Sequence, residues 1–337
     1  MKKVLIFITL IFIPLFLYSQ QSRFDYVEGE VSIKRVSGEL IKAQIADVLN
    51  IGDSVITGFD GFAELSLENT SKISIDSDTV FIISKKEKQG QKKNIFMVVL
   101  GKIGFKFDRL LNEPDIQTPA TVAGVRGTEF TVVSSLDGSA LYVVNEGSVA
   151  VESEGTLVVL TTEEGVEVPI GEKPGEKFEV KIGSVDFSGW LDKGNDEFEK
   201  DPARVLSDVT EKLVEYADEA TRFFHNYEDS FSMLSEMREN MISIEKEKGS
   251  EAKSEYYKKE IFPKETETSN YVLNYRYFAL SALSLRRYVL SSMYIDMKTK
   301  YILDTKNPIF SKFLDEYEKF LQVYEKNVVP FLVEADI

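Results

Sequence analysis

The stretch TPATVAGVRGTEFTVV, Thr118 to Val133, places a proline and two glycines between runs that alternate apolar and polar residues. Alternation of period two is typical of strands, and glycine permits positive φ and a close approach of neighbouring strands. Arg126 and Glu129 are close enough in sequence to form an ion pair across a corner, where the guanidinium could also bond turn carbonyls. The pattern predicts a structural corner of a β fold. The competing interpretation makes Arg126 an anchor for an anionic partner.

The composition excludes several classes of function. With 337 residues, 43% of them hydrophobic, the chain is long enough for two domains with real cores. A formal charge of −16 repels polyphosphates, so nucleic acid is not an expected partner. The absence of cysteine excludes disulfides, thiolate metal sites and thiol catalysis. The single histidine, His225, cannot form a metal cluster alone, and we expect neither a metal nor a cofactor.

The N-terminus carries a targeting signal. Lys2 and Lys3 precede an apolar run from Val4 to Tyr18, and Ser19 follows. These features predict a cleaved secretory signal peptide at residues 1–19. The alternative is an uncleaved anchor, which the run is too short to favour, because a spanning helix needs about 20 residues. We therefore expect an exported mature protein without a stable membrane span.

Residues 21–187 show strand periodicity throughout. Ala63, Leu65 and Leu67 alternate with polar residues, as do Ile103, Phe105 and Phe107. Many glycines separate these short runs, and no amphipathic segment of helical length lies between them. The pattern predicts an all-β domain, built as a roll, short solenoid or sandwich.

After Trp190 the period changes to that of helices. Asp201-Pro202 predicts a helix start, and a heptad register follows from Leu206 to Ile244 before a break near Gly249. We expect a hinge at residues 188–200 and a three-helix bundle or coiled-coil-like domain at residues 201–337. The same heptads could pair two chains, so a homo-oligomer is an alternative.

The later helices are less evenly patterned. Residues 246–270 are charged and lack a steady period, which predicts a loop with a short helix at residues 251–262, closed by Pro263. A second long helix is expected at residues 269–303, and a third from Asn307-Pro308.

The order of motifs in the first half resembles the extracytoplasmic FecR domain. The most specific element of that family is matched by Thr118, Pro119, Val122 and the run from Ala123 to Phe130, with Thr121 in place of the usual alanine. Gly52, Asp53, Thr57 and Gly58 match the family's earlier turn, and Leu141 to Val151 match its final strand. The resemblance covers about 160 residues and is specific.

The resemblance implies a role in signalling. Family members that regulate iron uptake relay a receptor signal to a sigma factor, through a cytoplasmic segment and one membrane span that precede the domain. Here only three residues precede the apolar run. We therefore expect the exported domain without the cytoplasmic half, which makes direct control of a sigma factor doubtful.

These observations predict a non-enzymatic protein of the periplasm that acts by protein–protein interaction or signalling, with an unidentified envelope protein as its partner. The alternative is an envelope scaffold or adhesin, at the cell surface or secreted, whose helices oligomerise or bind glycan. We expect no catalytic residue. The candidate interaction site is the motif itself, namely Thr118, Pro119, Gly124, Arg126, Gly127, Thr128, Glu129 and Phe130.

Overall fold

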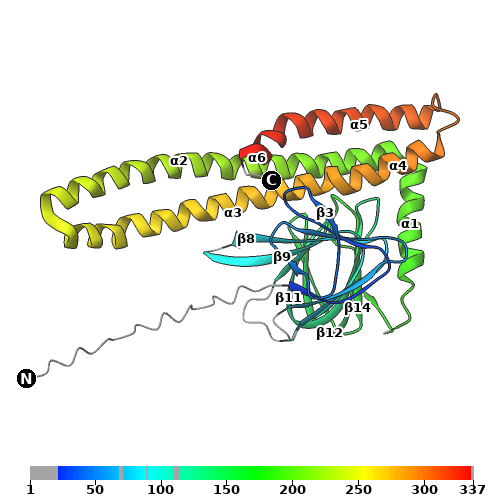
Figure 1. The fold of residues 1–337 in the computed structure, drawn as a ribbon. Coiled ribbons are helices and arrows are strands. Elements are labelled where there is room, and N and C mark those ends of the chain that lie inside the picture. The colour runs from blue at the N-terminus through cyan, green and yellow to red at the C-terminus, as the bar shows by residue number, and fades with distance from the viewer. Residues whose placement is uncertain (1–21, 68–70, 89, 109–113, 182, 335–337) are drawn as a thin grey trace, which may run out of the picture.

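The computed structural model describes residues 22–67, 71–88, 90–108, 114–181 and 183–334. Within these ranges a β domain is followed by a helical region, which confirms the predicted order of an all-β and an all-α part (Figure 1). The predicted signal peptide at residues 1–19 lies outside the described residues. None of the described helices combines the length and the apolar character that a membrane crossing requires.

Fifteen strands are present in the described part of the chain, and all of them are connected in one sheet. Their bounds are β1 Ser22–Glu28, β2 Val31–Lys34, β3 Leu40–Lys42, β4 Val48–Leu49, β5 Ser54–Thr57, β6 Phe62–Leu67, β7 Ser71–Ile75, β8 Val80–Lys88, β9 Gln91–Lys106, β10 Asp115–Gln117, β11 Val122–Ser134, β12 Ala140–Ser153, β13 Thr156–Thr161, β14 Glu164–Val168 and β15 Phe178–Glu179. The main path runs β15-β14-β12-β11-β10-β9-β7-β6-β1-β4, and β9 also pairs with β8 and directly with β11.

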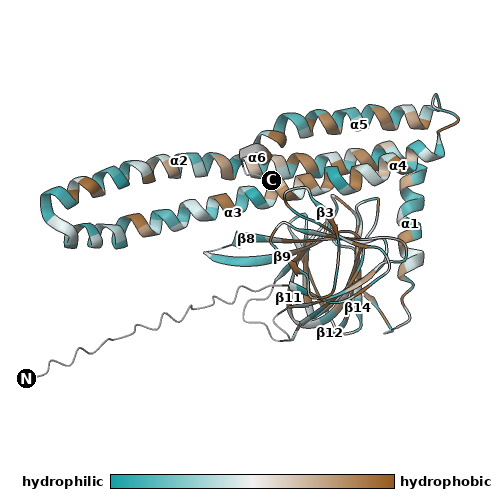
Figure 2. Ribbon diagram, viewed as in Figure 1, coloured by the Kyte–Doolittle hydropathy of each residue, from teal (hydrophilic) through white to brown (hydrophobic). Residues whose placement is uncertain are grey.

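The sheet is strongly curved (Figure 1) and encloses an apolar interior, and Figure 2 shows that hydrophobic residues recur along its strands. Phenylalanines from neighbouring strands stack at its centre. The ring of Phe105 on β9 lies 5.1 Å from that of Phe130 on β11 and 6.4 Å from that of Phe96. Phe130 is 1% exposed, so this motif residue is part of the core. The alternation seen in the sequence places such side chains on one face.

The strand β11 carries a bulge inside the motif. Its register with β12 shifts between Arg126 and Glu129, and Gly127 has a φ of 53°. Opposite the bulge, Gly147 on β12 has a φ of 89°, a conformation that side chains other than glycine adopt only with strain. The two glycines allow the strands to bend together, so the predicted corner is a bulged strand rather than a turn.

The helical region contains α1 Phe187–Lys200, α2 Pro202–Tyr256, η1 Tyr257–Ile261, α3 Phe262–Ser284, η2 Leu285–Leu290, α4 Ser291–Lys300, α5 Pro308–Asn327 and α6 Val329–Glu334. Both η elements are single π-turns that continue into the next α-helix. The predicted helix starts are confirmed, because the Asp201 carboxylate accepts a hydrogen bond from the Arg204 N–H and Asn307 Oδ1 accepts one from the Ile309 N–H.

The predicted loop at residues 246–270 is wrong, although the short helix predicted within it, at residues 251–262, is helical in the structure. The chain is helical there, apart from Gly249, whose φ of 84° and ψ of 177° make the bend between α2 and the returning helix. The π-turn η1 ends one residue before the Phe262-Pro263 pair that starts α3, and the Phe262 N–H bonds to the Tyr257 carbonyl. We attribute the error to this π-turn, which fits a proline into a helix that proline would otherwise interrupt. The second long helix thus begins about twenty residues earlier than predicted.

Residues 188–200, expected as a hinge, are helical and form most of α1. The helix begins where the Asp186 carboxylate accepts a hydrogen bond from the Gly189 N–H. Its apolar side is anchored, because Phe198 is fully buried and packs edge-on against Phe313 of α5 at 6.2 Å. The connection between the two parts is therefore an ordered helix, and a hinge motion there stays a prediction.

The long helices run antiparallel. The return helix, formed by α3, η2 and α4, passes between α2 and the β domain, and α5 lies along the first half of α2 (Figure 1). The predicted heptad positions are buried in that half, including Leu206, Val209, Leu213, Tyr216 and Ala220. Packing between helices and against the sheet accounts for this burial, so the predicted three-helix arrangement applies to the part of α2 nearest the β domain.

The bulge provides a direct test of the motif's structural role. A Cβ at Gly147 would lie 2.6 Å from the Gly127 carbonyl oxygen, whereas one at Gly124 would have Asp115 Oδ1 at 4.0 Å as its nearest neighbour. We expect Gly147→Ala to lower the free energy of unfolding by roughly 2 to 4 kcal/mol, and Gly124→Ala to change it by less than about 1 kcal/mol. Urea denaturation followed by circular dichroism measures both. Equal effects of the two substitutions would contradict the assignment of the bulge.

Candidate functional site

The first part of the motif forms a buried turn between β10 and β11. The Thr118 N–H donates to the Thr121 carbonyl at 3.0 Å, and the Thr121 N–H donates to Thr118 Oγ1 at 3.1 Å. Both threonines are almost fully buried, and Pro119 lies between them at the edge of a cavity. Every polar group of this turn must therefore find its partner inside the protein.

Thr121, which departs from the family pattern, has a specific partner. Its hydroxyl lies 2.5 Å from the hydroxyl of Tyr142 on β12 and 2.9 Å from that of Thr118. Tyr142 is fully buried, and burial raises the pKa of its phenol well above the ordinary value. The phenol thus stays neutral and needs a hydrogen-bond partner, which an alanine at position 121 could not supply.

The residue before the turn, Gln117, joins the sheet to two helices. Its Nε2 donates to the hydroxyl of Tyr216 on α2 at 3.0 Å, and its Oε1 accepts a hydrogen bond from the hydroxyl of Tyr277 on α3. Ser281 Oγ lies 3.5 Å from the same Nε2. Burial is the largest cause of the raised pKa of both tyrosines, so both are neutral donors or acceptors. We call Gln117, Tyr216, Tyr277 and Ser281 the clasp.

A cavity of about 300 Å³ lies beside the clasp, between the turn, the β12–β13 connection and the helices α2 and α3. One wall is Lys86 of β8, whose ammonium lies 4.7 Å from the ring centre of Tyr277 and 4.5 Å from that of Phe278. Burial lowers the pKa of Lys86, and the charge of Lys88 lowers it further. On the other side Lys212 forms ion pairs with Glu215 and, at 3.7 Å, with Glu154. Aromatic contacts and ion pairs therefore bind the helices to the sheet around the cavity.

The second part of the motif lies in the sheet, away from the clasp. Glu129 forms a surface ion pair of 2.8 Å with Lys106 on β9. Arg126 has its backbone opposite Ser148 in β12, but its side chain is not among those that the structure describes. Its predicted pairing with Glu129 therefore stays a prediction. Thr128 is 2% exposed and its carbonyl accepts a hydrogen bond from the Phe107 N–H at 2.9 Å, which ties the bulge to β9.

The earlier turn of the family pattern also has an internal role. The Asp53 carboxylate is 2% exposed and accepts hydrogen bonds from Arg35 Nη1 at 2.5 Å and from the Asn50 N–H at 2.9 Å. Thr57 Oγ1 donates to the Asp76 carbonyl at 2.6 Å and accepts from the Thr79 N–H at 2.9 Å. These side chains hold β5 to its neighbours, so they are not available to a ligand.

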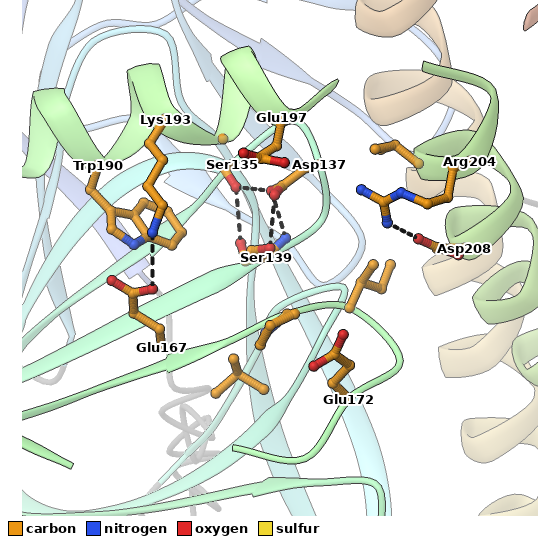
Figure 3. A pocket seen from close by; sticks show the side chains of 15 residues that line it. Ser135, Asp137, Ser139, Glu167, Glu172, Trp190, Lys193, Glu197, Arg204 and Asp208 are labelled. Carbon is orange, nitrogen blue, oxygen red and sulfur yellow. Dashed lines mark hydrogen bonds and ion pairs between the residues drawn. The ribbon is translucent and has the colours of Figure 1, made fainter. Parts of the chain in front are cut away.

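A second cavity, of about 240 Å³, lies between α1, the start of α2 and the β11–β12 connection (Figure 3). The Asp137 carboxylate accepts hydrogen bonds from Ser135 Oγ and from the N–H and Oγ of Ser139. Two ion pairs lie in its wall, Lys193 with Glu167 at 3.6 Å and Arg204 with Asp208 at 2.9 Å. The Lys193–Glu167 pair joins α1 to β14, while the other contacts lie within α2 and within the β11–β12 connection.

Metal binding can be examined directly in the described part of the chain. No group of three or more His, Asp and Glu side chains there is arranged to hold a metal. His225 lies on the exposed side of α2. The candidate site is therefore a junction between two parts of one chain, made by Thr118, Pro119 and the clasp.

Comparisons with known proteins identify the β domain. Residues 53–150 match the family model described as FecR protein. The chain therefore carries a FecR domain, as its motifs predicted, and the matched segment includes the turn, the bulge and Gln117. A search of curated proteins found no match.

Two solved structures of a candidate anti-sigma factor from Parabacteroides distasonis are similar to this chain. Both share 16% identity with it and cover 41% of its length, with TM-scores of 0.35 and 0.34. The similar region spans 64% and 63% of those two chains, less than two thirds of their length. A similarity at this level assigns neither a function nor a partner.

Sequence reasoning missed the clasp. The heptad register treats Tyr216 as an apolar contact, and no sequence pattern marks Gln117 as its partner. One signal is present in the sequence: Gln117 directly precedes a motif of small and apolar residues. A side-chain amide buried beside such residues needs a hydrogen-bond partner from elsewhere in the chain. Its partners lie 99 and 160 residues away in sequence, so no local pattern could identify them.

The clasp predicts a characteristic pattern of stability. Gln117→Leu leaves two buried phenols without a partner, and we expect it to lower the free energy of unfolding by about 2 to 4 kcal/mol. The triple variant Gln117→Leu, Tyr216→Phe and Tyr277→Phe removes the orphaned hydroxyls as well, and we expect it to regain at least half of that loss. Chemical denaturation of the single and triple variants measures both. A triple variant less stable than the single one would show that the hydroxyls do not act through Gln117.

Proposed function

We propose that the protein is a non-enzymatic, exported FecR-domain protein that works by protein–protein interaction or signalling in the periplasm. The FecR domain at residues 53–150 supports a signalling or regulatory role. The basic and apolar N-terminal residues support export. The comparisons give no support to the alternative of an envelope scaffold or adhesin.

The clasp is the single observation that carries this proposal. The first turn of the most specific FecR motif lies under the helices of its own chain, because Gln117, which directly precedes the turn, bonds to both α2 and α3. The turn is therefore not an open loop that waits for a ligand. It is a fixed contact between two parts, and a displacement of α2 or α3 acts directly on the turn and on β11.

This arrangement suggests how a partner could be sensed. Breaking the clasp would leave a buried amide and two phenols without partners. Each unpaired group would lower the stability of the protein by about 1 to 3 kcal/mol. A partner that binds the helices more tightly in a shifted position could supply that energy. The helical region is then the receiving surface, and the β domain responds through its signature turn.

Export is tested by fractionation of a double-envelope bacterium that produces the full chain with a C-terminal tag. We expect the protein in the periplasmic fraction, with a mass that lacks residues 1–19. A cytoplasmic protein of full mass would overturn the proposed export, and digestion by protease added to intact cells would favour the adhesin instead. A cytoplasmic protein that shares the cells serves as the lysis control.

The receiving surface is tested by photo-crosslinking in intact cells. A photoreactive amino acid is placed at Val214 on α2 or Ile295 on α4, which are 36% and 64% exposed, and at Leu157 on β13, which is 59% exposed, as the matched control. We expect one envelope protein to be captured from the two helical positions and not from β13. Capture of the same protein from Leu157 alone would assign recognition to the sheet.

A further inference from the structure

The cavity beside the clasp, of about 300 Å³, has an exposed rim and a buried wall, and we call it the junction cavity. Lys88, Glu152 and Gly155 of its lining are exposed, so a ligand can enter from solvent. Ala120 and Phe278 are 3% and 8% exposed and belong to the buried wall. The volume lies at the lower end of the range of small-molecule sites, about 300 to 1,000 Å³. The junction cavity therefore has room for a small molecule and not for a folded partner.

Lys86 places a positive charge in this wall without an acid beside it. The side chain is partly buried, and its ammonium lies 4.7 Å and 4.5 Å from the ring centres of Tyr277 and Phe278. Within the described part of the chain it forms no ion pair. Burial lowers the pKa of Lys86, so the charged ammonium is less stable here than in water. An anion beside Lys86 would offset the stabilisation that burial removes.

The acids that act on Lys86 are held by other cations. Asp115 and Glu219 raise its pKa through their charge, but both lie beyond ion-pair distance from it. Asp115 pairs with Lys93 at 2.9 Å, and Glu219 pairs with Arg222 at 2.5 Å. The counter-ion that Lys86 lacks can therefore come from a ligand.

The buried turn adds a backbone donor to the same wall. Ala120 lies inside the turn that the Thr118 N–H closes on the Thr121 carbonyl. The Ala120 carbonyl accepts a hydrogen bond from Ser153 Oγ at 2.9 Å. Its N–H has no acceptor in the ranges that the structure describes. Because buried N–H groups are almost always bonded, this donor indicates a water or a ligand acceptor in the cavity.

The charges of the lining select the kind of anion. Three lysines and three acids line the junction cavity, so it has no excess charge to attract a polyanion. Glu154 lies 3.7 Å from Lys212, and Glu152 is exposed at the rim. The acids are thus paired or peripheral, whereas Lys86 is partly buried and unpaired. A ligand with a single negative charge matches this arrangement.

We propose that the junction cavity binds a small organic carboxylate with an apolar body. The Lys86 ammonium is the counter-ion of the carboxylate, and the Ala120 N–H is a second donor in the same wall. The apolar body lies against Ile95, Pro119 and Val122. Because the ligand contacts both the turn and α3, it favours the arrangement in which the clasp is formed. The inference does not rest on the proposed function, because it requires neither export nor a partner protein.

Ligand-detected NMR on the purified protein tests the binding of benzoate, phenylacetate and 4-methylpentanoate, each paired with its uncharged amide. We expect at least one carboxylate to bind with a Kd at or below about 1 mM, and its amide to bind at least about tenfold more weakly. Inorganic phosphate at the same concentration should not displace it. If none of the three carboxylates binds at about 10 mM, the cavity holds water only and the proposal is overturned. Equal binding of a carboxylate and its amide, or displacement by phosphate, overturns it as well.

Two lysines of β8 give a matched pair of variants. Lys86→Met keeps an unbranched side chain over the rings and removes the charge, and we expect at least about a tenfold weaker binding. Lys85→Met removes the same charge one residue earlier, on the other face of the strand and outside the cavity lining, and should leave binding unchanged. Circular dichroism verifies that both variants fold. Unchanged binding by a folded Lys86→Met protein would contradict the assigned counter-ion.

The backbone amides locate the ligand. The bound carboxylate should shift the NMR signals of Ala120 and Gly155 and leave that of Gly194, in the second cavity, unchanged. Glu152→Gln removes the acid at the rim, and we expect it to tighten binding about two- to fivefold. Shifts centred on Gly194, or weaker binding by Glu152→Gln, would show that the carboxylate does not bind beside Lys86.

Discussion

The β domain and the helical region are joined by hydrogen bonds between buried polar groups, each of which would otherwise lack a partner. The turn at Thr118 to Thr121 cannot be covered by helices unless the Gln117 amide finds both a donor and an acceptor beneath them. Tyr277 supplies the donor from α3, and Tyr216 supplies the acceptor from α2. These bonds require both long helices to lie at one rotation and one height above the sheet. The clasp therefore specifies the geometry of the junction, while the apolar contacts around it supply most of its burial.

The motif has two roles that are separated along β10 and β11. Its first residues form the turn under the helices, and its last residues build the interior of the sheet through Phe130 and the bulge opposite Gly147. Thr128, within the bulge, accepts a hydrogen bond through its carbonyl from the Phe107 N–H, directly after β9. A shift of the turn along the strand would meet this bulge within a few residues. The sheet thus resists displacement of the turn. The junction between the turn and the helices α2 and α3 is therefore stiff.

Much of the fold could be predicted from the sequence because its signals are local. Alternation gave the strands, and Asp201-Pro202 and Asn307-Pro308 gave two helix starts. The continuation of the helix through Pro263 could not be predicted, because the π-turn before this proline has no clear sequence pattern. The site was predicted only in part for a related reason. Thr118 and Pro119 stand in a recognisable motif, but the partners of Gln117 are distant in sequence and bond through hydroxyls that a heptad pattern treats as apolar.

The burial of α2 decreases along its length. This decrease determines which part of the helix can change when a partner binds. Near its start Leu206, Val209 and Leu213 are fully buried, with α5 and the sheet close by. Farther along α2, beyond the end of α6, Leu234 is still buried, while Phe231 is 47% exposed. Local opening costs less where fewer apolar contacts are lost, so this distal part of α2 opens more readily than the part nearer the β domain. A contact made on the distal part would order it, and the same helix carries Tyr216, which bonds to Gln117 beside the signature turn.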